Sequence, residues 1–215
     1  MKKTSRFSKL TKIVTVVSIA TLCSAFLFVH FLPIIRERWF TKPTVVAEGD
    51  NARAHIFLLD AGKKIQLSSN DSNHRDPFWR GDFIVWVDEP QNKSEKYIVR
   101  YHIPTKTQLQ LTTASVAQHP KVSTEGFVVW QEWIDETWQV LYFDGSQTTE
   151  ISSGSAAINP DIAGTKIVYA QKNSASNWEA LLFDTQNKTT EVILEGENAK
   201  FPLFHDTTPT FAQSE

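Results

Sequence analysis

The sequence predicts an all-β protein: a small β-propeller, four-bladed with its last blade shared between the chain ends, preceded by one N-terminal transmembrane helix. Two repeated series predict the propeller. Similar five-residue passages recur at intervals of 42, 42 and 40 residues, beginning at Ile56, Ile98, Val140 and Ala180. Prolines recur in phase, at intervals of 43, 40 and 42 residues, at Pro77, Pro120, Pro160 and Pro202. Self-similarity at this period, with strand-like content, is typical of propeller blades.

Each full repeat predicts four strands in about 40 residues, the pattern of a propeller blade. A polar residue and proline open the inner strand, where proline costs no ladder bond at the first position. A glycine turn follows, and then a β-branched and aromatic run such as 83–86, typical of a buried strand. The third strand carries the first repeated series, and an outer strand such as 108–111 follows it. The equivalent aromatics that end the second strands, Trp86, Trp130, Tyr169 and Phe211, are predicted to pack between blades.

The two ends of the array are complementary halves. The first repeat keeps only its third and fourth strands, at 54–67, and the last keeps only its first two, at 202–213. We expect these halves to pair in one sheet, which closes the ring and covers edges that would otherwise be exposed. Pro209 falls inside the second strand of that blade and predicts a short or distorted strand. The alternative is a partial array that closes only by pairing with another chain.

The repeat resembles the TolB-type propeller repeat, most clearly over residues 77 to 112. The matching positions are Pro77, Gly81-Asp82, Ile84-Val85-Trp86, Tyr97-Ile98 and Leu111-Thr112. It is also similar to propeller repeats of some prokaryotic cell-surface proteins, and the resemblance extends over about 54–213. TolB-type proteins carry a separate α/β domain ahead of the propeller, for which this sequence has no room, and usually six or more blades. A role in the Tol-Pal system is therefore not implied.

The N-terminal 50 residues predict the cellular location. Residues 1–12 form a basic cytoplasmic tail, 13–35 a transmembrane signal-anchor helix, 36–53 a linker and 54–213 the propeller domain. The apolar run has 23 residues; a membrane span needs about 20, whereas the apolar part of a cleaved signal peptide has about 7–15. Five bases precede the run, which favours a cytoplasmic N-terminus. We therefore expect a single-pass cell-membrane protein with its propeller on the extracytoplasmic side.

Composition and motifs narrow the function. The net charge is −2, so nothing in the composition indicates a nucleic-acid partner. The single cysteine lies in the predicted membrane helix, so the exported domain needs no disulfide. No nucleophile elbow, zinc-binding motif or phosphate-binding glycine loop occurs. We therefore predict no catalytic residue, no metal ligand and no cofactor.

One face of the propeller is the predicted binding surface. Loops before the inner strands and loops after the second strands emerge together, and such loops carry function on rigid scaffolds. The candidate residues are His74, Arg75, Asp76, His119 and Asn159, with the loop aromatics Trp133, Trp138 and Trp178. Asp76, His119 and Asn159 occupy equivalent positions, whose fourth member is Phe201. Such side chains can ligate a cation, but capping at the start of a strand is the favoured interpretation.

A second polar series ends the third strands: Asp60, His102, Asp144 and Asp184. Capping of the following turn is favoured over a ring of functional acids. The function predicted is a non-enzymatic binding or scaffolding module for an envelope protein or a cell-wall glycan. The alternative is a glycan-active hydrolase or lyase with its site at the axial mouth of the propeller.

Overall fold

The computed structural model describes residues 43–50, 53–69, 71–91, 93–113, 115–153 and 156–211. These residues form seventeen strands and one short 3-10 helix, η1 (Glu197–Lys200). The described residues within 45–58 and 65–211 belong to one compact unit. The predicted transmembrane helix, 13–35, lies outside the described residues. Among those that are described, no helix has the length and apolar character that a bilayer crossing requires.

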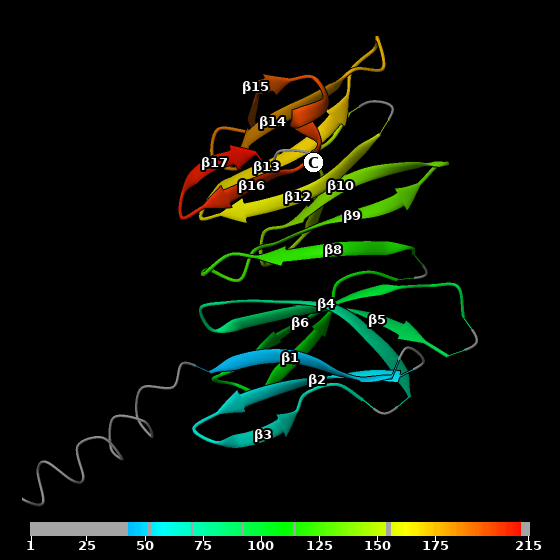
Figure 1. Cartoon of the computed structure of the whole chain (residues 1–215), viewed down its shortest axis with the longest axis vertical. Helices are drawn as coiled ribbons and strands as arrows, with labels where there is room; N and C mark the ends of the chain where they lie inside the picture. The colour runs from blue at the N-terminus through cyan, green and yellow to red at the C-terminus, as the bar shows by residue number, and fades with distance from the viewer. Residues whose placement is uncertain are drawn as a thin grey trace, which may run out of the picture. The chain divides into compact units, whose positions relative to one another are not determined.

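Three complete four-stranded antiparallel sheets confirm the predicted repeat unit (Figure 1). Sheet II contains β4 (Ser72–Arg80), β5 (Phe83–Pro90), β6 (Tyr97–His102) and β7 (Thr107–Gln110). Sheet III contains β8 (Ala117–Val122), β9 (Val128–Ile134), β10 (Thr137–Phe143) and β11 (Thr148–Glu150). Sheet IV contains β12 (Ala157–Ala163), β13 (Lys166–Lys172), β14 (Trp178–Asp184) and β15 (Thr189–Glu195). In each sheet the strands lie side by side in chain order.

The inner strands β4, β8 and β12 share a bulge at the polar residue and proline. The pairing register shifts there in all three strands. Asp76, His119 and Asn159 have φ angles of 50°, 52° and 54°, a left-handed conformation that Asp, His and Asn adopt more readily than most residues. The polar residue and proline thus lie within the inner strand rather than at its start. A bulge tolerates proline because the ladder is already interrupted there.

The apolar cores lie between consecutive sheets, as the aromatic series predicts. Trp86, Trp130 and Tyr169 are almost fully buried, whereas Phe211 is half-buried. Trp130 of sheet III packs with Val85 of sheet II. Trp86, Trp130 and Tyr169 each pack against residues of the neighbouring sheet, which confirms the prediction of inter-blade packing at these three positions.

The two end sheets are separate, which corrects the prediction of a shared closing blade. Sheet I contains β1 (Thr44–Asp50), β2 (Arg53–Asp60) and β3 (Lys63–Gln66), and sheet V contains β16 (Pro202–His205) and β17 (Thr208–Phe211). Residues 44–50 fall in the predicted linker, 36–53, but form β1. Because β1 lies against β2, it occupies the edge where β17 was expected to pair (Figure 1).

Pro209 fits into β17 without loss of a ladder bond. It pairs with Phe204, whose backbone N–H donates to Asp161 Oδ2 at 2.8 Å, away from β17. In an antiparallel ladder, this makes Phe204 and Pro209 a non-hydrogen-bonded pair, so the proline nitrogen also faces away from β16. The strand is short, as predicted, with four residues. Its outer edge lacks an N–H donor at Pro209, which makes it a poor template for a further strand.

Candidate functional site

His119 and Asn159 line one pocket, which we call the inner-strand pocket. Its volume is about 240 Å³, and its lining residues come from β8, β12 and the start of β16. They are His119, Lys121, Asn159, Pro160, Asp161, Phe201, Pro202 and Leu203. Two members of the predicted binding face are therefore brought together. Phe201, the fourth member of their series, is 46% exposed and forms part of the apolar wall.

Each polar member of this series has a distinct contact. His119 Nδ1 lies 3.9 Å from Asp76 Oδ2, and both side chains are about half exposed. Asn159 is tied on both sides: its backbone N–H donates to Gln131 Oε1, and its side-chain amide donates to the Lys200 carbonyl, each at 2.9 Å. Asn159 therefore links sheets III and IV to the segment that leads into β16.

Lys121 and Asp161, each directly after a repeat proline, give the pocket its charge. Asp161 is buried and its two carboxylate oxygens accept from the backbone N–H groups of Ile162 and Phe204, each at 2.8 Å. Lys121 Nζ lies 4.2 Å from the centroid of the Phe78 ring, a cation–π distance. Burial lowers the pKa of Lys121, and the nearby carboxylates of Asp161 and Asp76 oppose that shift.

The loop aromatics lie beside the segments that lead into the inner strands. Trp133 and Trp138 are cross-strand neighbours on β9 and β10, with ring centroids 5.3 Å apart in a T-shaped arrangement. Trp133 is 44% exposed, and its backbone N–H donates to the carbonyl of Val116, directly before β8. Trp178 is half-buried, and the Lys200 ammonium lies 5.7 Å from its ring. The Lys200 carbonyl also accepts from Asn159, so Lys200 contacts both Trp178 and a lining residue of the inner-strand pocket.

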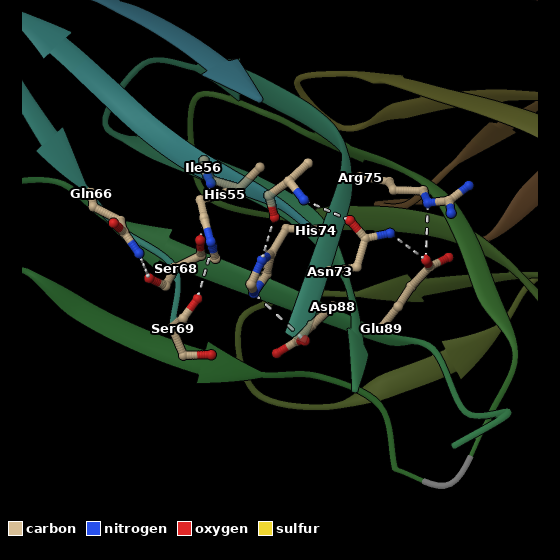
Figure 2. A network of polar contacts seen from close by, with 11 residues as sticks. His55, Ile56, Gln66, Ser68, Ser69, Asn73, His74, Arg75, Asp88 and Glu89 are labelled. Atoms are coloured by element: carbon tan, nitrogen blue, oxygen red, sulfur yellow. Dashed lines mark hydrogen bonds and ion pairs between the residues drawn. The ribbon is translucent and has the colours of Figure 1, made fainter. Parts of the chain in front are cut away.

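His74 and Arg75 belong to a different polar network, between sheets I and II (Figure 2). His74 is 1% exposed; its Nδ1 contacts the Ala54 carbonyl at 2.9 Å, and its Nε2 lies 3.6 Å from Asp88 Oδ1. Burial lowers the pKa of His74, against the raising effects of the Ala54 hydrogen bond and Asp88. His74 is thus part of the packing between these sheets rather than of the surface.

Glu89 is the acceptor at the centre of this network. Arg75 Nε and Lys96 Nζ each lie 2.9 Å from its carboxylate, and Asn73 Nδ2 donates to it at 2.9 Å. Asn73 in turn accepts from the backbone N–H of Ala54 at 2.9 Å. Desolvation raises the pKa of Glu89, but the bonds from Lys96 and Asn73 and nearby positive charge outweigh it, so the net pKa is lowered. The ion-pair partner of Arg75 in this network is thus Glu89, on the neighbouring strand of the same sheet (Figure 2).

The acids that end the third strands cap turns. Asp144 Oδ1 accepts from the backbone N–H groups of Ser146 and Gln147, each at 2.8 Å. These bonds, with the Ser146 hydroxyl, lower the pKa of Asp144 to about 2. Asp184 makes the equivalent bonds to Gln186 and Asn187, which lower its pKa. At these two positions the turn-capping interpretation is confirmed.

Sequence reasoning missed Lys121 and Asp161, although a signal for them exists. The residue after each repeat proline follows the same period: Phe78, Lys121, Asp161 and Leu203. Comparing this position across the repeats would have placed two charges beside the inner strands.

Across the ranges that the structure describes, no group of three or more His, Cys, Asp or Glu side chains could hold a metal ion. The polar groups that line the inner-strand pocket are an ammonium, an imidazole, an amide and a hydrogen-bonded carboxylate, beside an apolar wall.

Comparison with known proteins supports the fold. No family model matches the chain, and no curated protein matches it. Its structure is similar to TolB from Acinetobacter baumannii, with a TM-score of 0.53, 15% identity and coverage of 75% of this chain and 43% of that chain. For the putative TolB from Agrobacterium tumefaciens, the TM-score is 0.55, identity 14%, and coverage 78% and 68%, respectively.

The acylaminoacyl peptidase from Pyrococcus horikoshii is similar over 72% of this chain and 27% of that chain, with 14% identity and a TM-score of 0.55. At such low identities the likeness shows the fold alone. The chain spans less than half the length of the Acinetobacter TolB chain. The fold class is thus β-propeller-like, and the structural resemblance to TolB-type propellers is confirmed.

Proposed function

We propose that this chain is a membrane-anchored, extracytoplasmic β-propeller protein that binds or scaffolds an envelope protein or a cell-wall glycan without catalysing a reaction. Trp133 carries the proposal. Its ring is 44% exposed beside the start of β8, whereas the repeat aromatics Trp86 and Trp130 are fully buried. An exposed tryptophan at the rim of a rigid sheet is typical of a binding hot spot and also suits stacking on a sugar.

The location rests on residues 13–35 and the five bases before them. A reporter fused after Glu215 should be active only in the exported compartment, and activity in the cytoplasm would contradict the proposed orientation. Intact mass of the membrane-bound protein tests the anchor separately. A mass that corresponds to cleavage near residues 36–45 would identify a signal peptide instead.

Binding is favoured over the alternative, a glycan-active hydrolase or lyase. Glycoside hydrolysis ordinarily uses two carboxyl groups on opposite sides of the scissile bond. Of the acids that the structure describes, Asp161 is the one that lines the inner-strand pocket, and backbone N–H groups already occupy both of its oxygens. Its arrangement is that of a structural acceptor.

A small ring of about four blades is part of the proposal. The three complete sheets supply three blades, and β1 occupies the edge of β2 that the last half-blade was expected to share. Because β1 occupies that edge, closure requires that another chain supplies strands, which is the alternative that the sequence left open. The mass of the native full chain in detergent tests this, since a dimer supports closure between chains and a monomer contradicts it.

The binding role is tested by capture from detergent-solubilised envelope. The full chain should retain an envelope protein or purified cell-wall glycan, and Trp133→Ala should weaken that capture by about 1–2 kcal/mol or more. Leu109→Ala is the matched control, because Leu109 is 43% exposed but lies on the outer strand β7. Equal capture by wild type and both folded variants would refute a role for the surface formed by Trp133 and the adjoining Trp138, which we call the Trp133 surface.

A further inference from the structure

We propose that the inner-strand pocket receives an acidic side chain, Asp or Glu, from an extended segment of a protein partner, and that Lys121 supplies the positive charge that recognises it. This inference rests on the proposed function, since it names the chemistry of the partner. Such recognition requires a positive group that can still donate hydrogen bonds, an apolar wall beside it and a volume that suits one inserted side chain.

Lys121 provides the positive group. Its ammonium packs 4.2 Å from the Phe78 ring centroid, and the residue is half-buried. Among the residues that the structure describes, none forms a hydrogen bond or ion pair with Lys121 Nζ. An ammonium removed from water without a charged partner is unfavourable, and a carboxylate would supply charge-assisted hydrogen bonds. The lowered pKa of Lys121, caused mainly by burial, is consistent with this unmet demand.

The neighbouring charges do not meet the demand. Asp161 lines the same pocket, but its oxygens accept from Ile162 and Phe204. The Asp76 carboxylate also acts on the pKa of Lys121, but it lies 3.9 Å from His119 Nδ1 and forms no ion pair with the ammonium. The Arg80 guanidinium is a second cation beside the Phe78 ring, 5.3 Å from its centroid. Arg80 also donates a hydrogen bond to the Ile162 carbonyl. The Phe78 ring therefore contacts two cations, and the ammonium of Lys121 can still donate hydrogen bonds to a carboxylate of a partner.

The other side of the pocket is apolar. Phe201 and Leu203 are 46% and 41% exposed, and Pro160 and Pro202 complete this wall. A carboxylate with apolar groups beside it is a property of a peptide in which an acidic residue follows or precedes a hydrophobic one. An uncharged ligand would leave Lys121 without a complementary group.

The size of the pocket favours a side chain over a complete small ligand. Its volume of about 240 Å³ is below the roughly 300–1,000 Å³ typical of small-molecule sites. A single Glu or Asp side chain fits such a volume while the rest of the segment stays outside. The neighbouring Trp133 surface can then contact the same partner, which makes the pocket one part of a larger interface.

The test compares two peptides that differ only in charge. Ac-Leu-Glu-Leu-NH2 and Ac-Leu-Gln-Leu-NH2 are titrated into the detergent-solubilised full chain, and binding is followed by calorimetry or ligand-observed NMR. The Glu peptide should bind at least about tenfold more tightly, the ratio that 1.4 kcal/mol represents. Equal affinities would overturn the inference, as would tighter binding of glucuronic acid than of the Glu peptide.

Variants then assign the effect to Lys121. Lys121→Met keeps an apolar stem without the charge and should abolish the preference for Glu over Gln. Lys166→Met, on β13 and outside the pocket, should leave it unchanged. A Glu preference that survives in folded Lys121→Met would overturn the assignment, and if that variant does not fold, the two-peptide comparison on the wild type still decides. Trp133-dependent capture without a Glu preference would refute this inference alone and leave the proposed function standing.

Discussion

Charged groups between sheets I and II pair with one another, whereas Lys121 of the inner-strand pocket has no ion pair among the described residues. At the first junction, Asn73 bridges the backbone of Ala54 and the carboxylate of Glu89, to which Arg75 and Lys96 also bind. At the pocket, Lys121 has an aromatic contact in place of an ion pair. Both regions lie beside bulged inner strands. Polar side chains on the inner strands can therefore join two sheets, as Asn73 does, or lie against an aromatic ring without an ion pair, as Lys121 does, depending on which side chains the neighbouring elements supply.

The largest effect is expected from the core behind the first junction. Trp86 packs with Ile56 of sheet I and is fully buried, so Trp86→Ala should lower the free energy of unfolding by about 3–5 kcal/mol through a cavity. Denaturant unfolding followed by circular dichroism measures this loss. Trp133→Ala is the comparison, because its ring is 44% exposed and its truncation should cost much less.

Trp86→Phe gives a finer control for that measurement. The indole Nε1 of Trp86 is buried and, within the described residues, has no hydrogen-bond partner. Phe retains most of the apolar volume and removes the unsatisfied donor, so it should be far less destabilising than Ala.

If Trp133→Ala is as destabilising as Trp86→Ala and folded Trp133→Ala retains full capture, both rings are core and the Trp133 surface loses its support.

The next effect is expected at Asp161, the structural acid of the pocket. Asp161→Ala leaves the buried N–H of Phe204 without its acceptor and also removes the acceptor of Ile162. The expected loss is about 2–4 kcal/mol, since each buried donor left unsatisfied costs about 1–3 kcal/mol. Asp161→Asn keeps one acceptor oxygen and should lose less. Equal stability of Asp161→Ala and wild type in urea would show that this carboxylate does not join sheets IV and V.

A smaller, pH-dependent effect separates the first junction from the pocket. Burial lowers the pKa of His74 in the folded protein, so the unfolded chain binds a proton at a higher pH than the folded one. The contribution of His74 is therefore present above its unfolded pKa of about 6.5 and lost as the pH falls below it. Thermal unfolding between pH 7 and 5 should show a weaker decline for His74→Gln than for wild type. Parallel pH profiles would contradict this effect.

The smallest effect is expected at the exposed turn after β10. Its hydrogen bonds lower the pKa of Asp144 from 3.8 to about 2 in the folded state. This contribution is present above pH 3.8 and is lost as the pH falls toward 2. In acid titrations of stability, Asp144→Asn should reduce the slope over that interval and leave the first junction unaffected. An unchanged slope would mean that the turn bonds do not distinguish the two protonation states.

Within-sheet structure was predictable because its signals are local. The repeated prolines and the β-branched runs placed the strands of sheets II, III and IV, and the aromatic series identified Trp86 and Trp130 as core. The turn role of Asp144 and Asp184 followed from their position before a turn. Even β1 has strand-forming residues, Val45 and Val46, but Pro43 and Gly49 on either side of them predicted a linker.

The sequence by itself thus determined the period, the strand content and the buried aromatics, because these depend on side-chain alternation and turn chemistry within some 40 residues. Tertiary structure decided whether each polar residue is paired. Asp161 meets Phe204 across 43 residues, and Arg80 meets Ile162 across 82. Such contacts depend on which sheets lie next to each other, so only the folded chain buries His74 between two sheets and places the Lys121 ammonium against the Phe78 ring.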